Sequence, residues 1–157
     1  MPSVFLDGLA KPLLVLHALA AFALLGACTH QAVVGMGLLQ GRLHLCRLAR
    51  VYAAVIGPLF AATFTIGLLM YPHYRYHVRG LYLDRHAVWA SNLFDMKENL
   101  LALGLPLALA LFVAGRHLRP ESDRALIGFQ AYSALALWAL VGFGSISGLL
   151  VTSARGV

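Results

Sequence analysis

Four long apolar runs constrain this chain more than any other feature of its sequence. Each run approaches or exceeds the about 20 residues that a helix needs to cross a bilayer. A chain that enters lipid must satisfy its backbone hydrogen bonds internally, and a helix does so. The runs cover residues 12–39, 51–71, 93–115 and 125–151. They predict an all-α polytopic membrane protein, with four transmembrane helices in an antiparallel bundle and a single domain over residues 1–157.

The composition agrees with a membrane protein and argues against other classes. Apolar residues make up 61% of the chain and charged residues 11%, against about 45–50% and about 25% in soluble domains. The formal net charge of +6 comes from arginines that flank the apolar runs, where they anchor helix ends and meet anionic lipid. No basic run is long enough to indicate a nucleic-acid partner. The expected partners are the lipid bilayer and either larger membrane subunits or further copies of the chain.

The sequence carries no motif of a hydrolase or an ATPase. It has no nucleophile–base pattern, no phosphate-binding loop and no zinc motif. The two cysteines, Cys28 and Cys46, form neither a CxxC motif nor a metal-binding spacing. The first apolar run is too long for the core of a signal peptide, so we expect it to remain as a membrane anchor.

An antiparallel bundle brings the unusual polar residues to one end. Both chain ends and the second connection lie on one side, here called side A, and the first and third connections lie on the opposite side B. Side A collects the connection YPHYRYHVRGLYLDRHAVW and, beside it, His17, Asp95, Lys97 and Glu98. A lysine or glutamate at the mouth of a membrane is costly to leave unpaired and is therefore a candidate functional group.

The first interpretation of side A is a haem b site. His17 would ligate the iron through a neutral imidazole. The second axial ligand would be a neutral lysine amine or a histidine of the connection, and arginines would pair with the propionates because a guanidinium matches the geometry of a carboxylate. The residues that could fill these roles are Lys97, His73, His77, Arg75, Arg79 and Arg85.

The second interpretation is a structural ion network, formed by Lys97 and Glu98 with Asp95, that seats the third helix at the membrane interface. Residues one apart do not face each other on a helix. Lys97 and Glu98 would therefore need partners from other elements, and Arg79 or Arg85 could serve Glu98.

The third interpretation is an external transition-metal site. His73 and His77 have the four-residue spacing that places two side chains on one face of a helix. Imidazole is a common ligand of transition metals. Pro72 and the density of tyrosine and arginine leave open whether this connection is helical.

Small residues line one stripe of the third helix. Lys97, Gly104, Ala108 and Gly115 fall within about 20° of one another around the helix axis. Such a stripe admits the close approach of a neighbouring backbone or of a flat ligand. It is therefore compatible with both helix packing and a cofactor.

Three stretches resemble the HemJ-type protoporphyrinogen oxidases and related small four-helix haem-binding membrane proteins. They are LHALAAFALLGA with its early histidine, LFAATFTIGLLMYP, and a third helix that opens with aromatic-x-x-Lys, and the likeness covers about residues 13–111. In that family the early histidine and the lysine are essential and associated with haem b, which implies these roles for His17 and Lys97. The stretch YPHYRYHVRG and the acidic Asp95 and Glu98 depart from the family pattern. The resemblance therefore implies the haem more than the oxidase activity.

These patterns favour a small haem-b-associated membrane protein that acts in electron transfer as an accessory subunit of a larger membrane redox complex. The alternative is a cofactor-free structural membrane subunit, and a third interpretation is a HemJ-like porphyrinogen oxidase. We expect the protein in the bacterial inner membrane. Sides A and B carry six basic residues each, but those of side B lie in shorter connections. We therefore expect the first and third connections to be cytoplasmic.

Overall fold

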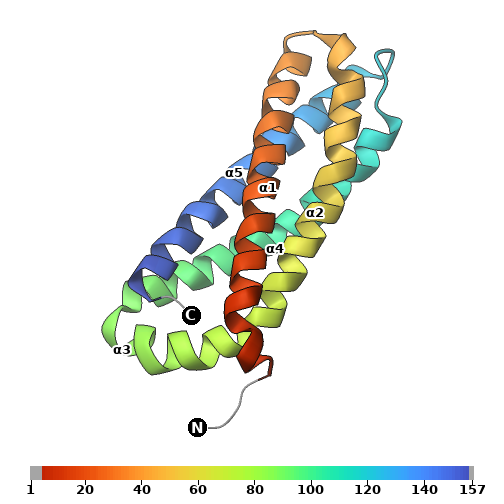
Figure 1. Cartoon of the computed structure of the whole chain (residues 1–157). Coiled ribbons are helices and arrows are strands. Elements are labelled where there is room, and N and C mark those ends of the chain that lie inside the picture. Colours follow the sequence, from red (N-terminus) through yellow and green to blue (C-terminus); the bar gives the residue numbers. More distant parts are fainter. Residues whose placement is uncertain (1–4, 156–157) are drawn as a thin grey trace.

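Four long helices run alternately up and down, which confirms the predicted all-α four-helix bundle. The computed structural model describes residues 5–155. Figure 1 shows both termini at the same end of the bundle as the connection between the second and third long helices, as an antiparallel arrangement requires. The long helices are α1 (Ala10–Leu39), α2 (Cys46–His73), α4 (Val88–His117) and α5 (Arg124–Ala154).

The four helices form a closed square. Helix α1 packs against α2 and α5, and α4 packs against the same two helices. Helices α1 and α4 therefore stand across the diagonal of the bundle. A side chain from one can meet a side chain from the other only through the interior.

The interior combines small residues with large apolar ones such as Ile56 and Leu137, and many further large apolar side chains lie on the outer surface. The central core includes Cys28, Ala53, Ala108 and Ala134. Large side chains such as Leu19, Phe22, Leu103, Leu109 and Leu149 are more than half exposed on the outer surface. Small interior residues let membrane helices approach closely, and lipid is the natural surrounding for an apolar exterior. All four helices are long and apolar enough to span a membrane.

The small-residue stripe of α4 faces α2. A Cβ atom on Gly104 would lie 2.6 Å from the Phe60 ring, and one on Gly115 would lie 2.7 Å from Cβ of Ala53. Ala108 belongs to the same central core. Helix α2 therefore fills this stripe, which serves close helix packing rather than a flat ligand.

The second connection is helical, a question that the sequence left open. Helix α2 runs through Pro72 and continues into the π-helical segment η3 (Tyr74–Leu83) and the short α3 (Asp84–His86). Ala87, with φ −148°, separates α3 from α4. Figure 1 shows η3 and α3 crossing the end of the bundle.

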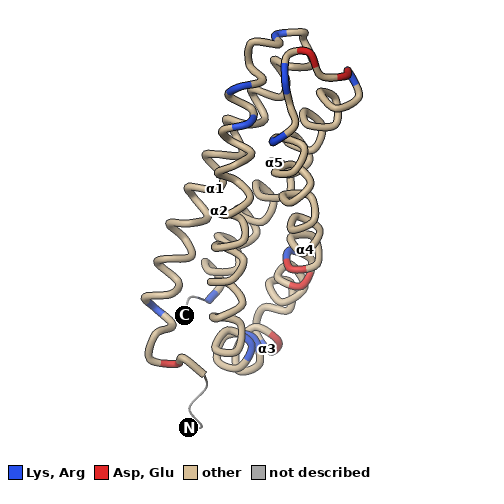
Figure 2. The backbone as a smooth tube through the Cα atoms, turned by 90° about the vertical axis from the view of Figure 1, so that its right-hand side faces the viewer, with Lys and Arg blue, Asp and Glu red and all other residues tan. Residues whose placement is uncertain are grey.

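The segment formed by η3 and α3 is amphipathic. Tyr74, Val78 and Leu83 are buried against the bundle, whereas Arg75 and Arg85 are exposed. The apolar face thus holds the segment on the end of the bundle, and the arginines face outward. Figure 2 shows the charged residues at the two ends of the bundle and at the start of α4, with long uncharged stretches of helix between them.

Candidate functional site

His17 lies on α1 with its ring toward α2. Its Nδ1 is 3.1 Å from the carbonyl oxygen of Thr63. Because a carbonyl oxygen only accepts hydrogen bonds, Nδ1 carries the hydrogen, and Nε2 of the neutral ring keeps a free lone pair. Gly67 makes room for the ring, since a Cβ atom there would lie 3.3 Å from Cε1 of His17. His17 is therefore held in a tautomer that suits a metal ligand.

Lys97 lies on α4, diagonally across the bundle from α1. Its Nζ stands 4.3 Å from the centre of the Phe94 ring, which stacks on Tyr74 with 3.9 Å between ring centres. In the described part of the chain, the ammonium meets this aromatic face rather than a carboxylate. Lys97 is also within electrostatic range of His17. The two residues singled out by the resemblance thus lie in the same part of side A, each with its own contact, the carbonyl oxygen of Thr63 for His17 and the Phe94 ring for Lys97.

Arg79 holds the connection against the start of α4. Its two terminal nitrogens donate to the carboxylate of Asp95 at 2.5 and 2.9 Å, and its Nε lies 3.5 Å from Asp84. The hydroxyl of Ser91 donates to the same Asp84 carboxylate at 2.5 Å. Among the described residues, Arg79 therefore pairs with Asp95 and Asp84 and not with Glu98, the partner that the second interpretation suggested for it, and Glu98 is exposed.

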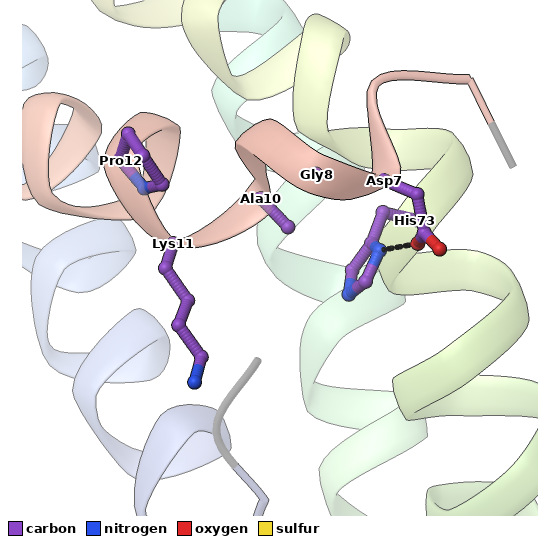
Figure 3. A pocket seen from close by; sticks show the side chains of 6 residues that line it. All are labelled: Asp7, Gly8, Ala10, Lys11, Pro12 and His73. Atoms are coloured by element: carbon purple, nitrogen blue, oxygen red, sulfur yellow. Dashed lines mark hydrogen bonds and ion pairs between the residues drawn. The ribbon is translucent and has the colours of Figure 1, made fainter.

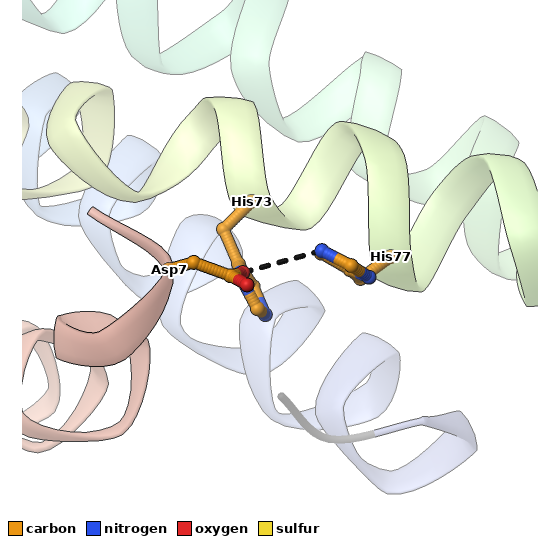
Figure 4. Close-up of side chains that lie close together, drawn as sticks. All are labelled: Asp7, His73 and His77. Carbon is orange, nitrogen blue, oxygen red and sulfur yellow. Dashed lines mark hydrogen bonds and ion pairs between the residues drawn. The ribbon is translucent and has the colours of Figure 1, made fainter. Parts of the chain in front are cut away.

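His73 and His77 gather around Asp7, which precedes α1 in the short turn η1 (Asp7–Leu9). Nδ1 of His73 is 2.6 Å and Nε2 of His77 is 3.2 Å from the same oxygen, Oδ1 of Asp7. Figure 4 shows both rings turned toward this carboxylate. Arg75 is exposed on the outer face of η3.

The candidate residues thus divide into separate groups rather than one pocket. The groups are His17 with Lys97, Arg79 with Asp95, and His73 and His77 with Asp7. The donor chemistry of the first group fits the axial ligation of a haem iron. The guanidinium of Arg79 is already committed to carboxylates of its own chain, so a propionate would have to compete for it.

Asp7 is a site residue that the sequence patterns did not single out. It is the only acidic residue before the first apolar run. The antiparallel topology already placed it on side A together with the end of the second helix, and this was the available signal. How the chain turns before α1 could not be read from the residues.

Cavities on the surface of the described residues include one near each end of the bundle. One, of about 350 Å³, lies beside the third group and is lined by residues of η1 and the start of α1 together with His73 (Figure 3). The other, of about 520 Å³, lies between α1 and α2 toward side B. His30 and Tyr52 line the second cavity, and their rings stack with 5.6 Å between centres.

No family model, curated protein or solved structure matches this chain. Its class is defined by the fold, an all-α bundle of four helices that are each long and apolar enough to span a membrane. Its function has to be inferred from the residues that this bundle brings together.

Proposed function

We propose that this chain is a small haem-b-associated integral membrane protein that acts in electron transfer, as an accessory subunit of a larger membrane redox complex. The observation that carries the proposal is the 3.1 Å bond from Nδ1 of His17 to the carbonyl oxygen of Thr63. Histidines that ligate metals almost always donate their second ring nitrogen in this way, which fixes the tautomer and the orientation of the ring.

Each residue of this group has a distinct role in the proposal. Haem b, when bound, supplies one-electron redox chemistry. His17 would bind the iron through Nε2, and Thr63 and Gly67 would fix the plane of its ring. Lys97 would provide the second ligand as a neutral amine. Arg75, which is exposed on η3, would be available to a propionate without giving up a carboxylate partner.

The absorption spectrum of the protein purified in detergent, after expression with a haem precursor, tests the proposal. We expect a Soret band and α and β bands that sharpen on reduction with dithionite. His17→Ala should abolish these bands because it removes the donor atom. His44→Ala, at an exposed histidine in η2 (Leu43–Leu45), should leave them unchanged.

Two results would overturn the proposal. One is a colourless wild-type preparation from haem-supplied cells, and the other is equal retention of the spectrum in both histidine variants. Lys97→Met tests the second ligand separately, because a changed axial ligand shifts the spectrum and the reduction potential. If Lys97→Met leaves both unchanged, Lys97 is not a ligand.

A cofactor-free structural subunit is the second candidate, and the exposure of α1 favours it. In the most apolar stretch of α1, 11% of the residues are buried inside the protein, against 28% in the corresponding stretch of each of the other three long helices. Helix α1 therefore offers the largest free apolar face to lipid or to a partner helix. A colourless preparation would favour this candidate.

A HemJ-like oxidase remains the enzymatic candidate, and oxidation of protoporphyrinogen by the purified protein would favour it over an electron carrier.

A further inference from the structure

Three side chains from two distant parts of the chain converge outside the proposed haem site. Asp7 comes from η1, His73 is the last residue of α2, and His77 lies one helical turn later in η3. One ligand atom from each residue lies within 4.8 Å of the other two. A carboxylate and two imidazoles form a donor set that suits divalent transition metals.

The local structure of both segments produces this convergence. The four-residue spacing puts His73 and His77 on one face of the continuous helix, with 4.7 Å between their ring centres. Leu6, with φ 58°, adopts a left-handed conformation that is unusual for leucine, and the chain then turns into η1. The carboxylate of Asp7 is thereby brought next to a ring nitrogen of each histidine (Figure 4).

An ion pair between protein groups does not explain the whole cluster. His73 donates from Nδ1 to Asp7 and is satisfied. Nε2 of His77 is buried and has no hydrogen-bond partner in the described part of the chain, although it lies 3.2 Å from the same carboxylate oxygen. A buried polar atom without a partner is costly. A cation between the three donors would satisfy it.

The donor atoms lie close enough together to share one small cation. Ligand atoms bound at about 2.0–2.1 Å to a tetrahedral Zn²⁺ stand about 3.3 Å from one another. The 3.2 Å separation between Nε2 of His77 and Oδ1 of Asp7 is close to this value, whereas the 2.6 Å between Nδ1 of His73 and the same oxygen is a hydrogen-bond distance that would lengthen when an ion binds. The rings are less than a quarter exposed, at 16% and 20%, whereas the Asp7 side chain is 39% exposed. Solvent can therefore reach the cluster from the side of Asp7.

The surroundings leave room for a further ligand. The cavity of about 350 Å³ beside Asp7 and His73 can hold water. Lys11 also lines this cavity and is the cation that would oppose metal binding. Figure 3 shows its side chain extending away from the carboxylate.

We propose that Asp7, His73 and His77 form a binding site for a divalent transition metal, with Zn²⁺ as the probe that best suits the donor set. Three protein ligands leave the fourth tetrahedral position to a water molecule from the cavity. The bound ion would tie the segment before α1 to the connection that crosses side A. The proposal does not depend on haem, because its residues and its ion are different.

Metal binding by the full chain tests this site. The protein is purified in detergent with an affinity tag that contains no histidine, treated with a chelator, and titrated with Zn²⁺ by calorimetry and with Co²⁺ by visible absorption. We expect about one Zn²⁺ per chain and Co²⁺ bands of tetrahedral intensity. His77→Ala should weaken binding by at least about tenfold, since even the loss of a supporting partner of a metal ligand has that effect.

His86→Ala is the matched control. His86 belongs to the same helical connection, but it is exposed and its Nδ1 lies 3.0 Å from the carbonyl oxygen of Tyr82. This variant should bind Zn²⁺ like the wild type. Asp7→Asn, which keeps the size of the side chain, should weaken binding without the risk of a packing defect in α2.

The unfolding temperature gives a second measurement that distinguishes the variants. Zn²⁺ should also raise the unfolding temperature of the wild type and of His86→Ala, but not that of Asp7→Asn or His77→Ala. A wild-type protein that binds no Zn²⁺ would overturn the proposal. Unchanged affinity in both Asp7→Asn and His77→Ala, or an equal loss in His86→Ala, would overturn it as well.

Discussion

Two glutamine side chains lie in the interior of the bundle and have no described partner. Gln31 on α1 is 1% exposed and Gln130 on α5 is 0% exposed. Within residues 5–155, none of their four amide atoms makes a hydrogen bond. A buried amide without a partner costs about 1–3 kcal/mol. These residues are therefore expected to weaken the bundle rather than to hold it together.

Gln130→Leu tests this expectation with a side chain of similar size. We predict that the free energy of unfolding rises by about 1–3 kcal/mol, because the uncompensated amide is removed. Thermal unfolding in detergent, followed by circular dichroism, measures the change. Gln40→Leu, at an exposed position after α1, should give no such gain. A lower stability of Gln130→Leu would show that the amide is engaged.

The helical elements could be predicted from the sequence except at their ends and in the second connection. The apolar run 93–115 corresponds to the part of α4 that can cross the bilayer. The helix itself begins earlier, at Val88, because its first turns pack against the protein. The continuation of α2 past residue 71 could not be predicted, because Pro72 and the polar residues after it are typical of a helix end. Pro72 lacks only one donor, and the buried Tyr74 and Val78 stabilise the segment that follows.

For the candidate site, the sequence could predict only what the topology determines, namely at which end of the bundle each residue lies. Placing His17 and Lys97 at the same end of an antiparallel bundle needs no knowledge of side-chain packing. The pairing of Arg79 with Asp95 depends on the π-helical register of η3, and the contact between Asp7 and His73 depends on the turn at Leu6. Both features arise from tertiary packing, which hydropathy does not encode.

The contact between α2 and α4 depends on a glycine. A Cβ atom on Gly115 would lie 2.7 Å from Cβ of Ala53, which is 1% exposed and has no flexible side chain to move away. We predict that Gly115→Ala lowers the free energy of unfolding by about 1–3 kcal/mol, since added volume in a packed interior forces the helices apart. The unfolding temperature in detergent measures the loss.

Gly142→Ala on α5 is the control for that variant. A Cβ atom there meets nothing within 4 Å, so only helix propensity changes, which favours alanine by up to about 1 kcal/mol. Equal unfolding temperatures for the two alanine variants would contradict the close packing of α4 on α2.

The bundle as a whole has two chemically different ends. Side A carries both termini, the amphipathic η3 and α3, and the Asp7, His73 and His77 cluster. Side B carries two shorter connections with their arginines. Basic residues in short connections favour the cytoplasm. With side B in the cytoplasm, the cluster of Asp7, His73 and His77 would lie on the opposite side of the membrane, where any ion that it binds would come from outside the cytoplasm.

Labelling of single cysteines tests this orientation. In a background with Cys28→Ala and Cys46→Ala, which removes two buried thiols, we introduce Glu121→Cys on side B or Arg85→Cys on side A, both at exposed positions. An impermeant maleimide should label Arg85→Cys in spheroplasts and Glu121→Cys only in inverted vesicles. The reverse pattern would place side A in the cytoplasm. Labelling of both from one face would contradict the four-span topology, because helix α4 separates these positions by about 45 Å at 1.5 Å per residue.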